Sequence, residues 1–194
     1  MQKRGEMENG TKSAIIKSVV LIILAAIVIG GIYFVLTRSK KPHSEEGYKL
    51  TVVDEITTTN LDKNYPADPR MVVELYGKIM QTMYKESYSE DQQDKMLDVL
   101  EGIMDDELLD NQTNFKKSIK DEVKERKEGD YSISVYQVQR IDLEAKLDGR
   151  NACTVDCYFY LRQGTAGIPS IYQFLLRQDA NGRWKILGWQ AKEG

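Results

Sequence analysis

The amino-acid sequence predicts an α+β domain that follows an N-terminal transmembrane helix. Residues 18–36 form an uncharged apolar run, residues 69–128 carry apolar side chains at helical spacing, and the residues from 131 onward alternate between apolar and polar. A block of helices followed by a block of strands is typical of an antiparallel sheet with helices on one face. We therefore expect about three helices packed on a curved antiparallel sheet.

The apolar run is long enough to cross a membrane once. As a helix, its 19 residues measure about 28 Å, close to the ~30 Å hydrocarbon core of a bilayer. The apolar stretch of a cleavable signal peptide is shorter, roughly 7–15 residues, whereas this run continues into a basic segment at residues 38–41. The sequence thus predicts a retained single-pass anchor over residues 18–37, in the cell membrane, with the lipid bilayer as its partner.

The flanks of the span favour one orientation only weakly. Four Lys or Arg residues precede the run and four follow it up to residue 49, so counting them does not decide the orientation. The short, positively charged tail of residues 1–17 suits a signal anchor, which would place the tail in the cytoplasm and the C-terminal domain outside it. Residues 38–60 are expected to form a juxtamembrane linker, in which residues 49–57 are either a short strand or an extended segment, and residues 61–194 the folded domain.

Capping signals and apolar stripes locate the three helices. Asp68 before Pro69 is typical of a helix N-terminus. Ser89, followed three residues later by Gln92, resembles a capping box and opens a second helix. The third helix begins near residue 113 and is expected at the surface, because its apolar stripe is narrow: Phe115, Ile119 and Val123.

Strand patterns begin after Gly129. In the segment 151–162, alternation with period two places one set of side chains on the inward face: Cys153, Val155, Cys157, Phe159 and Leu161. Four strand residues span about 13 Å, so the two cysteines cannot form a disulfide with each other and are expected to be small buried hydrophobes.

The remaining strands are bounded by turn signals. Residues 133, 135, 141, 143, 145 and 147 share one parity, and the break in the pattern at residues 137–139 indicates a bend or bulge. Asp148-Gly149 is expected to form a hairpin turn. A second hairpin is expected to pair residues 171–178 with residues 183–191, and residues 163–170 are expected to form a mobile loop.

The element order and the closing segment DANGRWKILGW at residues 179–189 resemble the nuclear transport factor two-like superfamily of cone-shaped domains. The resemblance covers about residues 68–192. More narrowly, LDKNYPADPRMVVELYGKIM at residues 61–80, placed after a single span, resembles an uncharacterised family of small bacterial membrane-anchored proteins. Because that family has no assigned activity, the resemblance implies a fold and a topology and no reaction.

The sequence favours binding over catalysis. It contains no HExxH, Walker, G-x-S-x-G or CxxC motif, and the expected inward strand face carries no acid or base. Asp142, Glu144 and Asp156 fall on the opposite face by parity, and the only histidine, His43, lies in the expected linker. We expect no cofactor, no metal and, with a net charge of −3, no nucleic-acid partner; a cone-fold lyase or isomerase is the least favoured alternative.

Two kinds of binding remain open, and the sequence leaves the partner, ligand, pathway and oligomeric state undetermined. A scaffold or interaction module, meeting a second copy or an envelope protein, would use exposed aromatic residues of the sheet: Tyr158, Tyr160, Tyr172, Phe174 and Trp189. A sensor or carrier for a small apolar ligand would use a pocket inside the cone, lined by Val72, Leu75, Ile79, Leu100, Val155, Cys157 and Phe159. The same seven residues form an ordinary core if the interior is filled.

Overall fold

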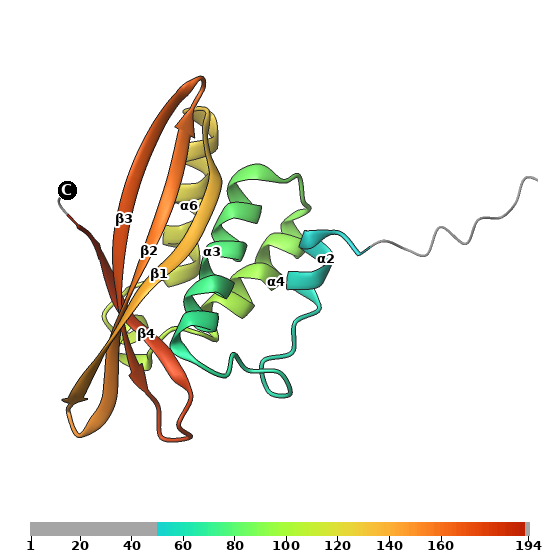
Figure 1. Cartoon of the computed structure of the whole chain (residues 1–194). Helices are drawn as coiled ribbons and strands as arrows, with labels where there is room; N and C mark the ends of the chain where they lie inside the picture. The colour runs from blue at the N-terminus through green and yellow to red at the C-terminus, as the bar shows by residue number, and fades with distance from the viewer. Residues whose placement is uncertain (1–49, 193–194) are drawn as a thin grey trace, which may run out of the picture. The chain divides into compact units, whose positions relative to one another are not determined.

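Five helices precede a four-stranded antiparallel sheet in the computed structural model, which describes residues 50–192 apart from the side chains of residues 140 and 143–145. The helices are α2 (Val52–Thr57), α3 (Pro69–Lys85), α4 (Glu90–Glu101), α5 (Asp106–Asp110) and α6 (Phe115–Glu128). The strands are β1 (Tyr131–Leu147), β2 (Arg150–Gln163), β3 (Ala166–Gln178) and β4 (Trp184–Ala191), and they pair in chain order as a meander (Figure 1). The predicted α+β class is confirmed.

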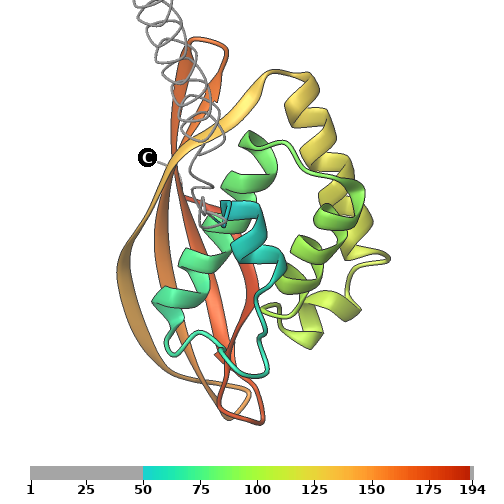
Figure 2. The same ribbon diagram turned by 90° about the vertical axis from the view of Figure 1, so that its right-hand side faces the viewer.

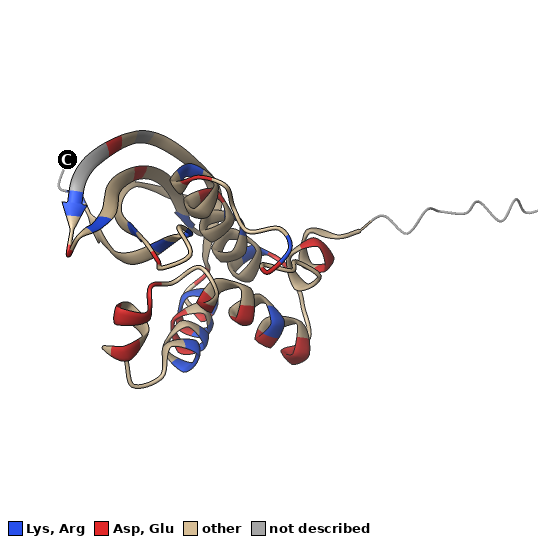
Figure 3. Ribbon diagram, turned by 90° about the horizontal axis from the view of Figure 1, so that it is seen from below, with Lys and Arg blue, Asp and Glu red and all other residues tan. Residues whose placement is uncertain are grey.

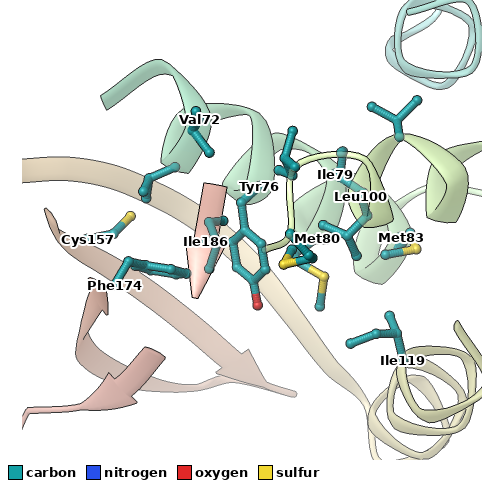
Figure 4. Close-up of a cluster of buried hydrophobic side chains, with 14 of the residues drawn as sticks. Val72, Tyr76, Ile79, Met80, Met83, Leu100, Ile119, Cys157, Phe174 and Ile186 are labelled. Atoms are coloured by element: carbon teal, nitrogen blue, oxygen red, sulfur yellow. The ribbon is translucent and has the colours of Figure 1, made fainter. Parts of the chain in front are cut away.

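The helices cover one face of a curved sheet. Strands β1 to β3 bend past α3, which lies against the concave face (Figures 1 and 2). Phe174 and Ile186 of the sheet meet Tyr76 and Ile79 of α3 in one buried cluster (Figure 4). Acidic and basic residues are interspersed on the helices (Figure 3), whereas apolar side chains of the helices and the sheet pack together in one buried core.

The predicted helix caps are present. Asp68 accepts a hydrogen bond from the Met71 backbone N–H at 2.9 Å, with Pro69 at the first helical position of α3. Ser89 and Gln92 form the reciprocal hydrogen bonds of a capping box at the start of α4. Side chains of this kind satisfy backbone N–H groups that have no partner within the helix, which is why these boundaries could be predicted.

Strand β1 is one long strand with irregularities in its register to β2. The register shifts between Ile133 and Val135 and again between Val138 and Ile141, so the predicted irregularity is confirmed. After the first shift, the side chains of β1 point to the face of the sheet opposite to the one that strict alternation predicts. The expected common parity of residues 133 and 135 was therefore wrong: Ile133 is buried, whereas Val135 is 52% exposed.

Two segments differ from their predictions. Residues 52–57, expected as a strand or an extended segment, form helix α2, because Thr51 and Asp54 make a capping box. Val53 and Ile56 of this helix are buried in the core. The folded domain therefore begins before residue 61. Residues 163–170, expected as a mobile loop, contain only a tight turn at Gly164 and Thr165, and β3 starts at Ala166. Gly164 provides the positive φ of 55° that this turn requires.

The predicted transmembrane helix over residues 18–37 and the histidine of the linker lie outside the described residues. Across residues 50–192, none of the helices combines the length and the hydropathy needed to cross a bilayer.

Candidate functional site

A cleft opens between α3, α6 and the concave face of the sheet. Its volume is about 100 Å³, and a single water needs only about 10–15 Å³ on the same measure. The cleft therefore has room for a small organic group. Most of its lining residues are aromatic: Tyr76, Tyr84, Tyr131, Phe159, Tyr172, Phe174 and Trp189.

The aromatic rings pack against one another and form the floor of the cleft. Tyr76 extends from α3 toward the sheet (Figure 4), with its ring centroid 4.9 Å from that of Phe174 and 5.5 Å from that of Trp189. The rings of Phe159 and Tyr172 meet edge to face at 5.8 Å. Tilted and edge-on arrangements are the favourable geometries for aromatic pairs, so these ring contacts stabilise the floor of the cleft.

Helix periodicity and strand register bring these residues to one place. Tyr76, Met80 and Tyr84 are four residues apart on α3 and therefore share one face of the helix. On the sheet, Phe174 pairs directly with Trp189, so the two rings lie side by side on the concave face. Met80, Ile133 and Leu161 complete the apolar part of the lining.

Helix α6 adds two opposite charges to the rim. Glu122 and Arg126 line the cleft one helical turn apart, and both are exposed to solvent. The Tyr84 hydroxyl donates a hydrogen bond to Glu122 Oε1 at 2.9 Å. The Arg126 guanidinium lies 5.1 Å from the centroid of the Tyr131 ring, within the range of a cation–π contact.

Two tyrosine hydroxyls in the cleft stay protonated at neutral pH. Burial raises the pKa of Tyr76 well above its usual range, and the negative charge of Glu122 raises it further. Burial and the same carboxylate also raise the pKa of Tyr84. Both phenols therefore keep their protons, and Tyr84 donates its proton to Glu122. The cleft thus combines an aromatic floor with the Tyr76 hydroxyl, one carboxylate and one guanidinium.

A family model matches residues 7–189, which include both walls of this cleft. The chain belongs to the family described as Domain of unknown function (DUF6715). The sequence predicted a family without an assigned activity, and this match confirms that part of the prediction. Comparison with curated proteins finds no match.

Most of the predicted pocket lining is core in the DUF6715 domain. Of the seven residues, only Phe159 borders the cleft. Five others have no exposed surface: Val72, Ile79, Leu100, Val155 and Cys157. Leu75 is partly buried against the same core. Packed side chains fill the interior around these residues. The cleft lies nearer the C-terminal half of α3, where α6 approaches the sheet.

Cys157 behaves as the buried hydrophobe that the sequence predicted. Both cysteines are free and buried. Burial raises the pKa of the Cys157 thiol to about 12, so almost none of it is thiolate at neutral pH, and the thiolate is the nucleophilic form. A role for this residue in covalent chemistry is therefore not supported.

The residues predicted for an interface divide between the two faces of the DUF6715 sheet. Tyr172, Phe174 and Trp189 point to the concave face and line the cleft, so their assignment to an exposed interface was wrong. Tyr172 pairs with Cys157 across β2 and β3, and paired residues share a face. Tyr158 and Tyr160 lie on the outer face, where they pair with Ile171 and Pro169.

Sequence reasoning missed the two charged residues of the cleft. Glu122 and Arg126 belong to the helix that was expected at the surface because its apolar stripe is narrow. Their spacing of four residues puts them on one helix face, but only the packing of α6 shows what this face meets. In the described part of the chain, no group of three or more His, Cys, Asp or Glu side chains is placed to hold a metal ion.

Proposed function

We propose that this chain is a membrane-anchored binding domain whose cleft takes a small ligand with an apolar body. The aromatic cleft is the observation that carries this proposal. Pockets that bind small molecules are typically lined by apolar and aromatic side chains, with a few polar groups that orient the ligand. This cleft has that composition: seven aromatic residues, three aliphatic residues and one pair of opposite charges.

We place the domain on the extracytoplasmic side of a bacterial cell membrane, held by a single helix over residues 18–37. The uncharged run and the basic segment that follows it support the anchor. The proposed fold is the nuclear transport factor two-like cone. Helices that precede a curved antiparallel sheet, with a cleft between the sheet and α3, support this assignment.

Binding without catalysis fits the chemistry of the lining. Catalytic acids and bases usually have pKa values tuned close to the working pH by burial and neighbouring charges. Glu122 is exposed, and its hydrogen-bond partner Tyr84 has a pKa raised far above neutrality. Because a fold does not by itself establish a reaction, we propose that the domain carries or senses its ligand.

Filling the cleft is expected to abolish ligand binding. Leu161 lies at its edge and is half-buried, so Leu161→Trp would occupy the space of a small aromatic ligand. We expect this variant to bind 4-fluorobenzyl alcohol at least about tenfold more weakly than the wild type, a loss of about 1.4 kcal/mol. The measurement is a ¹⁹F NMR titration of the full-length protein in lipid nanodiscs, with empty nanodiscs as the blank.

The matched control for this experiment is Tyr158→Trp, which adds the same side chain on the outer face of β2. It should leave the affinity unchanged. Equal affinities of Leu161→Trp and the wild type, or no saturable binding by the wild type, would contradict the proposed cleft.

Self-association through the outer sheet face is a second candidate function, with another copy of this chain as the partner. Exposed Val135 and Ile171 border Tyr158 and Tyr160 across three strands. The exposed fractions are 52% for Val135 and 37% for Ile171. Most homodimers use one surface patch on both subunits, and anchoring in one membrane would raise the effective concentration of the two patches.

Tyr160→Glu is expected to convert such a dimer to monomers. The substitution places a charge in the centre of the patch, and burying an unpaired charge at an interface is strongly unfavourable. The oligomeric state of the full-length protein in nanodiscs, measured by mass photometry, checks this. Arg162→Glu, at the end of the same strand face, is the control. A wild type that is monomeric at high concentration would remove this candidate.

A further inference from the structure

Two sets of charged residues on α6 differ in what they contact. Most of its lysines form ion pairs within the described part of the chain: Lys116 with Asp98 and Glu101, Lys117 with Asp121, Lys120 with Asp94, and Lys124 with Glu128. Glu122 and Arg126 belong to none of these pairs, and they are the two charged residues that line the cleft. Their charges are thus available to a molecule bound there.

Each of the two groups is held in place by an aromatic neighbour. Glu122 Oε1 accepts the Tyr84 hydroxyl at 2.9 Å, which leaves its second carboxylate oxygen for another donor. Arg126 rests on the Tyr131 ring, with 5.1 Å between the guanidinium carbon and the ring centroid. A guanidinium stacked on a ring keeps its N–H groups free for bidentate hydrogen bonds to a carboxylate.

The spacing of the two groups fits a compact ligand that carries both charges. Residues four apart on a helix have their Cβ atoms about 5–6 Å apart. An ammonium and a carboxylate on one carbon atom can therefore reach Glu122 and Arg126 at the same time. The substituent of that carbon would then extend over the aromatic floor formed by Tyr76, Phe174 and Trp189.

We propose that the cleft binds a free α-amino acid with an aromatic or branched apolar side chain. Arg126 takes the α-carboxylate, Glu122 takes the α-ammonium group, and the aromatic floor takes the side chain. The proposal rests on the proposed function, because it names the ligand class of the same cleft. A ligand with one charge leaves one of the two rim groups unused, so the zwitterion is preferred over both single-charge analogues.

The test compares three ligands of nearly equal size that differ only in their charged groups. L-phenylalanine carries both groups, phenethylamine lacks the carboxylate, and 3-phenylpropionate lacks the ammonium group. Calorimetric titration of the full-length protein in nanodiscs is expected to give the tightest binding for L-phenylalanine. Each analogue should bind about 10- to 100-fold more weakly, as expected for the loss of a hydrogen-bonded charged group.

Variants of the two rim residues separate the two contacts. Arg126→Gln should weaken the binding of L-phenylalanine and 3-phenylpropionate and leave phenethylamine unchanged. Glu122→Gln should weaken L-phenylalanine and phenethylamine and leave 3-phenylpropionate unchanged. Lys124→Gln and Glu125→Gln are matched controls on the same helix, because both side chains are exposed and neither lines the cleft.

The possible outcomes distinguish this inference from the proposed function beneath it. The expected pattern of ligands and variants supports both. If 4-fluorobenzyl alcohol binds in the cleft but the three ligands bind equally well, or the two variants do not discriminate among them, the amino-acid assignment is overturned and the apolar cleft stands. Absence of binding by all four compounds overturns both.

Discussion

Arg177→Ala is expected to lower the free energy of unfolding by about 3–5 kcal/mol. The side chain of Arg177 is only 2% exposed, and its guanidinium contacts three carboxylates. The distances are 2.6 Å to Asp105, 2.8 Å to Glu107 and 3.1 Å to Asp148. Removal of the cation would leave Asp105, itself 3% exposed, as a buried negative charge without its partner, which is the costly way to break a buried ion pair.

The cluster connects segments that are far apart in the sequence. Asp105 is the N-cap of α5, Glu107 lies in its first turn, Asp148 forms the β1–β2 turn, and Arg177 lies on β3. Arg177→Lys should also be destabilising, because an ammonium group cannot reproduce the fork geometry of a guanidinium. Chemical denaturation followed by circular dichroism measures both changes. Arg162→Ala, an exposed arginine on β2, should change stability by less than about 0.5 kcal/mol; equal effects of Arg162→Ala and Arg177→Ala would contradict the prediction.

The same cluster gives stability a dependence on acid. Burial on its own would raise the pKa of Asp105, but the hydrogen bonds from Arg177 and from the Glu107 backbone N–H, with the arginine's charge, lower it below its ordinary value. Because the pKa in the folded state lies below that in the unfolded state, the contribution of Asp105 to stability is fully present above about pH 4. It is lost as the pH falls through the lowered value. Asp105→Asn should therefore show a shallower loss of stability than the wild type in this acid range.

The helices were predictable because local chemistry determines them. The caps at Asp68 and Ser89 and the Asp148-Gly149 turn depend on residues within one or two turns of the chain, and these predictions were confirmed. Helix α2 was missed although its capping box is also local, because its six residues are too few to show a helical period.

The cleft could not be predicted because it depends on register and on packing between elements. The β2–β3 turn was mistaken for a loop, so the register that places Tyr172 opposite Cys157 was lost. One register choice decides which face every residue of a strand occupies. For this reason the concave-face aromatics Phe174 and Trp189 were assigned to a surface. The position of Glu122 depends on where α6 packs, which its own sequence does not specify.

Gly77→Ala is expected to destabilise the domain by up to about 2 kcal/mol, because the cost of overpacking outweighs the roughly 1 kcal/mol by which alanine is the better helix former. Gly77 is buried within α3, where the helix crosses β1 at Tyr136. A β-carbon at this position would lie 2.5 Å from Cδ2 and 2.8 Å from Cγ of the Tyr136 ring. Contacts this short force the ring or the helix to move, and overpacking of this kind typically costs about 1–3 kcal/mol.

A double-mutant cycle with Tyr136→Ala isolates the contact. Without the ring, Gly77→Ala should become stabilising by up to about 1 kcal/mol, because only the helix preference remains. Thermal and chemical unfolding of the four proteins measures the coupling. A Gly77→Ala variant that is more stable than the wild type would show that α3 does not need a glycine to pack against the Tyr136 ring.

The same substitution is expected to weaken ligand binding, which connects the helix contact to the cleft. Gly77 follows Tyr76, whose ring packs on Phe174 at 4.9 Å, and Tyr136 packs on Phe159 of the cleft lining with 6.4 Å between ring centroids. A shift of α3 or of the Tyr136 ring therefore moves the aromatic floor from two sides. The ¹⁹F titration should show weaker ligand binding for Gly77→Ala than for the wild type. If the Tyr136 ring transmits the shift, the double variant Gly77→Ala/Tyr136→Ala should recover the affinity. Unchanged affinity in Gly77→Ala would mean that the aromatic floor is independent of this helix contact.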